Sequence, residues 1–402
     1  MLKDICLCVE IHVPAIPLNY RFFDINHHHN YFEEEQVKGY VNKVCNENVL
    51  PFFETFRNIF YRFEGRFKIA VAVSGITLTL MRKYAPKVVK EFGEMLRGGC
   101  IEFLSVPWSH SILPFTNQKM LAQQIRLHDE AMDSAFGKLP EVFLTYAPIA
   151  SSQLVKNVFS SGKKAVFAYA NQFGNQFIDP SSLSERFSKQ GIYFINYLYS
   201  LLLKEIDFRI SHEPGENIVS AVIKKIKKNY SNLNPMIMLC QPATISRPFQ
   251  LNRAKIWEEV MVQLLKDNTI QFLLPSELIN NYNCFIPDDH NQQNILRQFI
   301  LPDFWLKNKL QKEAFSKQLR LNTHLRDNIG DDILNDWNVL IDMEYLYYMN
   351  MHFTEKIFAD NHFSPFSSPY TAYINYMNIL DDMDGRLQKR NIVIRVSTRN
   401  PA

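Results

Sequence analysis

The sequence predicts an α/β protein: a closed or nearly closed barrel of seven parallel strands, followed by a region of helices only. Two observations predict this class. Short apolar runs alternate with amphipathic stretches over the first 280 residues, as they do where helices cover parallel strands. Beyond residue 293 only amphipathic helical patterns remain. At 402 residues and 47% hydrophobic composition, the chain is long enough to bury a large core.

Seven runs have the length and apolar character of strands that are buried on both faces. The runs that begin near residues 5 and 236 are strong, whereas the run near residue 207 is weaker. A further run, 270–274, is a candidate for an additional strand that opens a second region. The seven runs are residues 5–12, 67–74, 101–106, 142–146, 165–169, 207–211 and 236–240.

Helical patterns fill intervals between these strands. Apolar residues recur on one face of 117–136, His128 is the polar member of that face, and Gly137 is the expected stop. Gly98 and Gly99 end the helix before it. Ser151 or Ser152 caps the helix that follows. The helices predicted in this region are 84–97, 117–136, 153–159 and 252–266.

The domain division follows from the change of pattern. Residues 1–280 form the predicted barrel, and the polar segment 281–293 is the predicted linker. Residues 294–387 are predicted to form a C-terminal α-helical domain that packs on the barrel. Residues 388–402 are expected to be a basic tail, either disordered or a late strand. The helices predicted after the linker are 301–321, 334–358 and 369–387.

The charge balance argues against two classes of partner. The chain carries 44 Lys and Arg against 41 Asp and Glu, a net charge of +3, which gives no electrostatic case for nucleic acid or an anionic membrane. The basic run 224–228 is assigned to the solvated face of a helix. No apolar run approaches the length that spans a bilayer, and no secretory signal pattern opens the chain. We therefore expect a cytoplasmic protein.

The cysteines indicate a reducing compartment. Their spacing fits neither a zinc ribbon nor a small disulfide scaffold. Four of them lie in or beside apolar runs, where cysteine behaves as a small buried hydrophobe. The six are Cys6, Cys8, Cys45, Cys100, Cys240 and Cys284.

Short motifs along nearly the whole chain form one ordered series. The series begins with Glu10-Ile11-His12-Val13-Pro14 at the end of the first strand. It continues with residues 20–25, 27–32, 99–104, 110–111, 272–277, 305–306, 310–315, 347–349, 363–370 and 376–378. In order and spacing these motifs resemble the family-57 glycoside hydrolases, specifically their α-amylase-like branch, over about residues 1–385. Val13 replaces the Gln of that family's first signature, a His-Gln-Pro tripeptide.

The resemblance implies an incomplete seven-stranded (β/α) TIM-like barrel with a C-terminal helical bundle, and an action on α-glucans with retention. In that family a Glu at the end of strand four is the nucleophile, and an Asp at the end of strand seven is the general acid/base. These positions fall on Ala147 and Cys240 here. The Glu-Gly pair expected after strand five is replaced by Tyr169-Ala170.

These replacements predict a pseudoenzyme. A retaining glycosidase needs two carboxyl groups about 5–5.5 Å apart. Ala147 offers no nucleophile, and a thiol at Cys240 in an apolar strand is a poor proton relay. The first hypothesis is therefore a protein without catalytic residues that binds an α-glucan or maltooligosaccharide, or a protein partner, in α-glucan metabolism. A purely structural subunit is a further hypothesis.

The rival hypothesis is an active retaining α-glucan hydrolase or transglycosylase with relocated carboxylates. Glu10 and Glu102 are acids within strands, where a structural role is the alternative. A Cys240–His12 nucleophilic pair is a third arrangement, against which stands a buried structural Cys. The loop acids near strand ends, for which a solvated role is the alternative, are Asp179, Glu185 and Glu213.

Three residues are predicted to contact substrate. His12 ends the first strand and is expected at a sugar or, alternatively, as a core histidine bonded to the backbone. Trp108 and His110 follow the third strand and are expected as a stacking platform and a hydrogen-bond donor, unless Trp108 packs on its own barrel. The run His27-His28-His29 is assigned to an ordinary loop, because three consecutive side chains cannot point one way. No metal or cofactor is expected.

Overall fold

The structure is a computed structural model of residues 1–402. It describes most of the chain, with gaps that fall mainly between residues 146 and 250 and between 286 and 305. The described residues are 3–145, 152–169, 187–188, 192–195, 219–220, 223–224, 226–227, 235–240, 251–282, 284–285, 306–325, 330–351 and 364–399.

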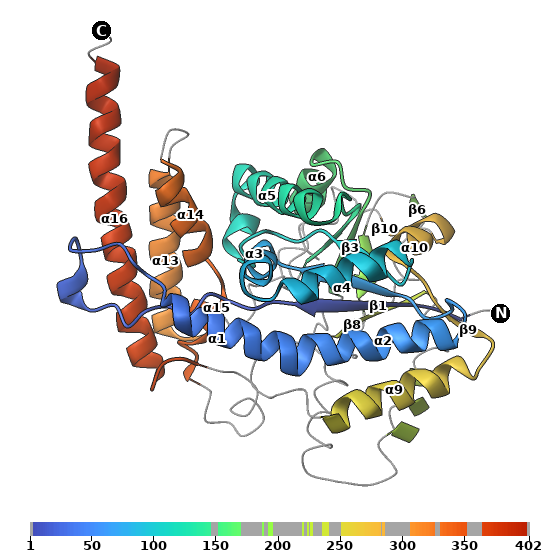
Figure 1. The fold of residues 1–402 in the computed structure, drawn as a ribbon. Helices are drawn as coiled ribbons and strands as arrows, with labels where there is room; N and C mark the ends of the chain where they lie inside the picture. The colour runs from blue at the N-terminus through green and yellow to red at the C-terminus, as the bar shows by residue number, and fades with distance from the viewer. Residues whose placement is uncertain are drawn as a thin grey trace.

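A parallel sheet with β1 at its centre organises the fold (Figure 1). β1 pairs in parallel with β2 on one side and with β8 on the other. From β2 the pairing passes to β3, through a bridge at Ser105 to β4, and on to β5, β7 and back to β8. The path of pairing therefore begins and ends at β1. These strands are β1 (Lys3–Ile11), β2 (Ile69–Val73), β3 (Ile101–Leu104), β4 (Val142–Leu144), β5 (Ala165–Tyr169), β7 (Ile192–Ile195) and β8 (Met236–Cys240).

Six of the predicted strands are confirmed, and one parallel strand was missed. β7 occupies the place between β5 and β8 in the path, and the sequence analysis did not assign it. The weaker run 207–211 lies outside the described residues. The additional candidate is a strand, β9 (Ile270–Phe272), which pairs with the first residues of β1. Two short antiparallel strands, β6 (Phe187–Ser188) and β10 (Cys284–Phe285), extend the sheet from β7.

Alternate residues of the strands enter two different cores. Leu7 and Val9 of β1 face the helices that cover the sheet, together with Val71 of β2. Cys6 and Cys8 point to the other face, where β2 supplies Ala70 and Ala72. Because both faces are buried, the strands are apolar at nearly every position, which is why their runs were visible in the sequence.

Helices cover the outer face of the sheet. The predicted helices are confirmed as α4 (Pro86–Arg97), α5 (Gln118–Phe136), α6 (Ser152–Ser160) and α9 (Leu251–Leu265). The sequence analysis did not assign α1 (Glu34–Val44), α2 (Leu50–Arg62), α3 (Gly75–Tyr84) or α10 (Pro275–Asn281). Gly137 ends α5 in the left-handed conformation, with φ of 64°. No described helix is long and apolar enough to cross a membrane.

Four further helices stand beyond the C-terminal end of β1 (Figure 1). They are α13 (Lys309–His324), α14 (Asp331–Leu340), α15 (Glu344–Tyr347) and α16 (Pro369–Arg399). α13 and α14 both pack against α16, around a core that contains Trp337 and Tyr376.

The structure corrects two expectations about this region. The single helix expected at 334–358 is broken after Leu340, because the Asp342 carboxylate accepts the Glu344 N–H (3.0 Å) and starts a new short helix. Residues 388–399 continue α16, where a disordered tail or a strand was expected. Of the predicted linker, residue 281 ends α10 and residues 284–285 form β10, while 283 and 286–293 lie outside the described residues.

A substitution at Gly75 tests the contact between α3 and the loop after β3. A Cβ at Gly75 would lie 1.9 Å from Cδ1 of Trp108, so the indole ring has to move. We expect Gly75→Ala to lower the free energy of unfolding by about 1–3 kcal/mol, as overpacking does, and to change Trp fluorescence.

Gly39→Ala in α1 is the matched control, because nothing lies within 4 Å of its Cβ. It should be neutral or slightly stabilising in urea denaturation. Trp108→Ala in the Gly75→Ala background should recover part of the loss. Equal stability of Gly75→Ala and the wild type would contradict the packing described.

Candidate functional site

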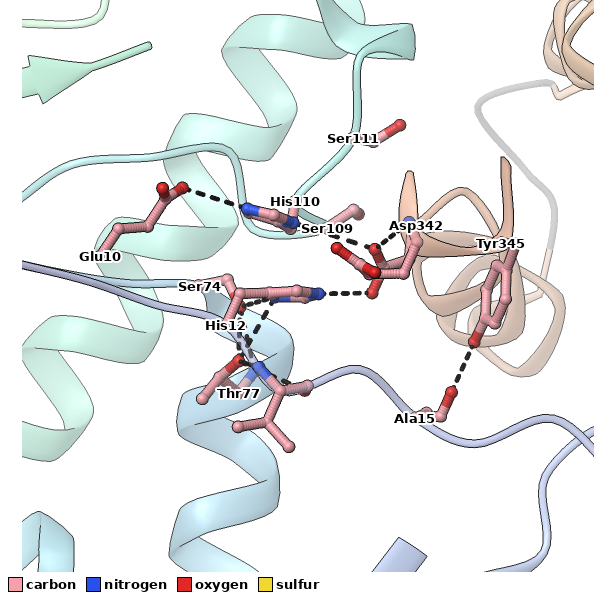
Figure 2. A network of polar contacts seen from close by, with 12 residues as sticks. Glu10, His12, Ala15, Ser74, Thr77, Ser109, His110, Ser111, Asp342 and Tyr345 are labelled. Carbon is pink, nitrogen blue, oxygen red and sulfur yellow. Dashed lines mark hydrogen bonds and ion pairs between the residues drawn. The ribbon is translucent and has the colours of Figure 1, made fainter. Parts of the chain in front are cut away.

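A buried group of acids and histidines lies where β1 ends (Figure 2). His12 follows β1 directly, and His110 lies in the loop after β3. Asp342 comes from the break between α14 and α15, more than two hundred residues further along the chain. With Glu10 and Glu344 they form what we call the junction cluster. All five residues are buried.

His12 is held by the first turn of α3. Its Nδ1 lies 2.8 Å from the Ser74 hydroxyl, which caps α3 and lies 2.8 Å from the Thr77 hydroxyl. Thr77 Oγ1 in turn accepts the Val13 N–H (2.7 Å) and donates to the Val13 carbonyl (3.3 Å). These bonds fix both the imidazole ring and the chain that follows it.

His110 stacks on His12 and binds Glu10. The two ring centroids are 3.7 Å apart, with 16° between the planes. Nε2 of His110 lies 3.1 Å from Oε1 of Glu10, so the carboxylate accepts its N–H. The backbone of His110 has φ of 50°, in the left-handed region, which costs on the order of 1 kcal/mol outside glycine. The contacts of its ring and carbonyl compensate for this strain.

Asp342 joins the C-terminal helices to these histidines. Its Oδ2 lies 2.9 Å from Nε2 of His12, and its Oδ1 lies 4.0 Å from Nδ1 of His110. Two further bonds cross the same boundary: the Met343 N–H donates to the His110 carbonyl (3.2 Å), and the Tyr345 hydroxyl donates to the Ala15 carbonyl (3.0 Å). The junction therefore fixes the α14–α15 break onto the loops after β1 and β3.

Burial decides the charges of the cluster. It lowers the pKa of His12 to about 3, against the opposing pull of Glu10, and it also lowers the pKa of His110. Burial raises the pKa of Asp342 to about 7. Burial, followed by the charges of Asp342 and Glu10, raises the pKa of Glu344 to about 8. Near neutrality the imidazoles are therefore neutral, and Asp342 and Glu344 keep a large share of their protons.

The arrangement offers two kinds of chemistry. Protonated buried carboxyl groups are donors of the kind that general acids use. In addition, His12, His110 and Asp342 each offer a ligand atom, and these atoms lie within 4.8 Å of one another. This is the set of three described residues with that property.

The structure brings two of the three predicted sugar contacts together. His12 and His110 stack, whereas Trp108 is half-buried against Gly75 at the start of α3, next to the Ser74 that contacts His12. The alternative role of Trp108, packing on its own fold, is therefore part of what it does. His12 is bonded to the Ser74 and Thr77 side chains, whereas the expected alternative was a bond to the backbone.

Glu10 and Glu102, the two acids within strands, lie in different environments. Glu10 belongs to the junction cluster. Glu102 lies in the first half of β3 and is buried at the other end of the sheet, where Ser276 donates to it from its backbone (3.2 Å) and its hydroxyl (2.6 Å). A small cavity lies beside it, lined also by Lys138 and Glu141.

The remaining predicted positions are placed in part. Cys240 ends β8, where its backbone is in register with Val9 of β1, and its side chain lies outside the description. Outside the described residues lie Ala147, Ala170, Asp179, Glu185 and Glu213. Of the basic run, Lys224 and Lys227 are described, and Lys227 lies 3.4 Å from Asp267 at the surface.

The three consecutive histidines diverge, as expected of an ordinary loop. His29 binds Asp382 of α16 (2.6 Å), whereas His28 lies 3.7 Å from Asp24. Asp382 also accepts bonds from the Asn26 N–H (2.6 Å) and the Tyr31 hydroxyl (2.5 Å). His128 is a core histidine, with Nε2 2.9 Å from the Val73 carbonyl.

Sequence reasoning missed Asp342 and Glu344. Both fell within a predicted helix, and no local pattern connects them with the end of β1. The one signal in the sequence was the pair of acids two residues apart in an otherwise apolar segment, which is unusual inside a buried helix.

Comparison with known proteins gives consistent matches. Residues 7–297 match the sequence model of glycosyl hydrolase family 57. A protein of Methanocaldococcus jannaschii named "Putative alpha-amylase" is 21% identical over 375 residues, which cover 88% of this chain and 78% of that protein.

Solved structures show the same fold at low identity. The α-amylase of Thermotoga maritima has a TM-score of 0.60 at 9% identity, covering 98% of this chain and 94% of its own. A branching enzyme of Pyrococcus horikoshii has a TM-score of 0.59 at 12% identity, covering 95% and 88%. The 4-α-glucanotransferase of Thermococcus litoralis has a TM-score of 0.58 at 11% identity; the match covers 86% of this chain and 56% of that one.

The pH dependence of stability tests the environment of Glu102. Burial raises its pKa, in spite of the opposing bonds from Ser276 and the charge of Lys138; the Glu141 charge raises it further. The folded state therefore holds this proton more tightly than the unfolded state. The resulting stabilisation is complete below the ordinary pKa of Glu and is lost as pH rises through the folded value.

We expect Glu102→Gln, which keeps an acceptor for Ser276, to lose less stability than the wild type as pH rises above the ordinary pKa of Glu. Urea denaturation at several pH values measures the difference. Glu94→Gln, at an exposed carboxylate of α4, is the control and should leave the slope nearly unchanged. Parallel curves for wild type and Glu102→Gln would refute the assignment.

Proposed function

The chain belongs to glycosyl hydrolase family 57, and on that premise we propose that it is an α-glucan-binding protein of storage-polysaccharide metabolism that does not cleave glycosidic bonds. The relatives named above are an α-amylase, a branching enzyme and a 4-α-glucanotransferase, which suggests an α-glucan as the ligand. The proposed lack of cleavage comes from this chain's own residues.

The sequence argument is the pair of replaced acids. Ala147, three residues after the end of β4, and Cys240, at the end of β8, stand where the family resemblance places the two carboxylates. Without a nucleophile and a proton donor, a retaining mechanism loses both of its chemical steps.

The structural observation that carries the proposal is the burial of the carboxylates at the end of β1. Glu10, Asp342 and Glu344 are at most 9% exposed. Glu10 is bonded to His110. Asp342 accepts a hydrogen bond from the Glu344 backbone and lies beside His12. Groups with these contacts and this burial support the fold.

We propose the architecture of the family for the finer points of the fold. The circular path of strand pairing supports an incomplete seven-stranded barrel in residues 1–280. The packing of α13 and α14 on α16 supports a helical domain in residues 294–387. The free cysteines Cys6, Cys8, Cys45 and Cys100 suit a reducing, cytoplasmic location.

The proposed glucan contacts remain His12, Trp108 and His110. The imidazole side chains are only 6% and 7% exposed, so a sugar would reach ring edges rather than faces. Trp108 offers a partly accessible indole in the loop that carries His110, and is the contact expected to contribute most.

Calorimetric titration with maltooligosaccharides tests the binding. We expect the wild type to bind maltoheptaose at millimolar or lower concentration. Trp108→Ala should weaken binding about threefold to tenfold, since an aromatic contact contributes on the order of 0.5–1.5 kcal/mol. Tyr61→Ala, at an exposed aromatic side chain of α2, is the matched control. Absence of binding heat at millimolar ligand would remove the glucan from the proposal.

One observation favours the rival function, an active hydrolase or transglycosylase. Glu344 keeps its proton to about pH 8, beside Asp342 and Glu10, and a protonated carboxyl group near other carboxylates is what acid catalysis of glycosides uses. Glu10, within the junction cluster, is then the relocated acid. Glu102 is too far toward the other end of the sheet to join it.

Turnover assays on amylose and on activated α-glucosides decide between the two functions. We expect rates no higher than those of a Glu10→Gln variant, because that carboxylate is bonded to His110. Hydrolysis or transfer by the wild type that falls at least a hundredfold in Glu10→Gln, with unchanged folding by circular dichroism, would establish the rival function instead.

A further inference from the structure

We propose that His12, His110 and Asp342 form a binding site for one divalent transition-metal ion of the Zn²⁺ type, which fixes the α14–α15 break to the ends of β1 and β3. The proposal concerns the same region as the proposed function but does not depend on it. It holds whether the chain binds a glucan, cleaves one or does neither.

Three potential ligand atoms converge in the junction cluster. Nε2 of His12, a ring nitrogen of His110 and a carboxylate oxygen of Asp342 come from three separate elements and lie within 4.8 Å of one another. Two ligand atoms bound to one zinc at about 2.0–2.2 Å stand about 3–3.5 Å apart. The separation of 2.9 Å between His12 and Asp342 is close to that value, and 4.0 Å between His110 and Asp342 is within a small movement of it.

The closest contact within this group lies between His12 and Asp342. Nε2 of His12 and Oδ2 of Asp342 are 2.9 Å apart, but neither atom has an aligned hydrogen bond in the described structure. Two ligand atoms of one ion have this relation, since they lie close together while each directs its lone pair at the ion and not at the other atom.

The hydrogen bonds of His12 and His110 indicate which nitrogen of each ring carries the proton. The hydroxyl proton of Thr77 goes to the Val13 carbonyl, so Ser74 donates to Thr77 and accepts from Nδ1–H of His12. Glu10 likewise accepts from Nε2–H of His110. The remaining nitrogen of each ring, on the Asp342 side, then carries a lone pair. A histidine whose far nitrogen donates to a carboxylate or hydroxyl is the usual form of a metal-binding histidine.

The charge distribution of the cluster favours a bound cation. The ligand atoms of His12, His110 and Asp342 lie within 4.8 Å of one another inside the protein, and Glu10 is bonded to His110. Such an arrangement is repulsive unless something positive lies between the lone pairs. A proton shared with Asp342 supplies this in one state, and a divalent cation would supply it more strongly.

Loading the ion has a structural consequence. The rings of His12 and His110 are stacked with only 16° between their planes, so their nitrogen lone pairs lie in two nearly parallel planes. His12 and Asp342 can therefore hold the ion first, and the His110 ring turns out of the stack to complete the set. Imidazole ligands favour Zn²⁺, Co²⁺ or Fe²⁺ over Mg²⁺ and Ca²⁺, which prefer oxygen ligands throughout.

Metal analysis of the full-length protein tests the site. After treatment with a chelator and loading with ZnCl₂, we expect one Zn²⁺ per chain by mass spectrometry of the metal, and a melting temperature several degrees above that of the chelated protein. Asp342→Asn and His12→Ala should each lose the ion and the thermal shift. Excess Mg²⁺ or Ca²⁺ should not displace it.

Two further variants separate the site from adventitious binding and from loss of folding. His27→Ala combined with His28→Ala removes the exposed His27 and the half-buried His28 of the loop and should leave the stoichiometry unchanged. Ser74→Ala keeps all three ligands. It removes the partner of His12 together with the cap of α3 and the contact with Thr77, so it should weaken zinc affinity about tenfold to a hundredfold and lower stability somewhat while the fold persists.

Two results would overturn the proposal. One is the absence of stoichiometric zinc at micromolar concentration in the folded wild type. The other is zinc that persists in Asp342→Asn and disappears with the loop histidines. Because neither readout involves glucan, failure here leaves the calorimetric test of the proposed function unaffected, and the reverse is also true.

Discussion

The contact between Asp342 and His12 is the constraint on which the rest of the structure depends. It places a carboxylate with no solvent exposure against a neutral imidazole, at the point where the C-terminal helices meet the end of β1. Buried polar groups destabilise a fold unless their partners are in place. The Ser74 hydroxyl, the Glu10 carboxylate and the Glu344 N–H therefore have to occupy fixed positions, and these positions in turn fix α3, β1 and the α14–α15 break.

Local pattern was sufficient for the elements whose faces are both buried. β1, β2 and β8 are nearly continuous apolar runs, and such runs predict parallel strands directly. β7 has only four residues, and its run was not assigned as a strand. The break at Asp342 was invisible for another reason: the apolar spacing of a helix continues across it, and only a side chain to backbone bond interrupts the helix.

The sequence predicted only part of the junction cluster. The ends of parallel strands meet at one side of a sheet, so His12 and His110 could be expected near each other from the positions of β1 and β3 alone. Asp342 could not, because no periodicity relates residues so far apart in sequence. Glu10 and Glu102 looked equivalent as acids within strands. Their separation depends on which half of the strand each occupies, and strand boundaries are the least certain part of any sequence interpretation.

The central position of β1 has a consequence for the synthesis of the protein. β1 leaves the ribosome more than two hundred residues before two of its neighbours, β8 and β9, with Ile5 in register with Met236 and Phe272. The loop after it is tied to Asp382, near the other end of the chain. An apolar strand thus waits through most of translation before its partners exist, and contacts of this range fold slowly. The nascent chain should accordingly depend on chaperones that shield β1 until β8 and β9 have emerged.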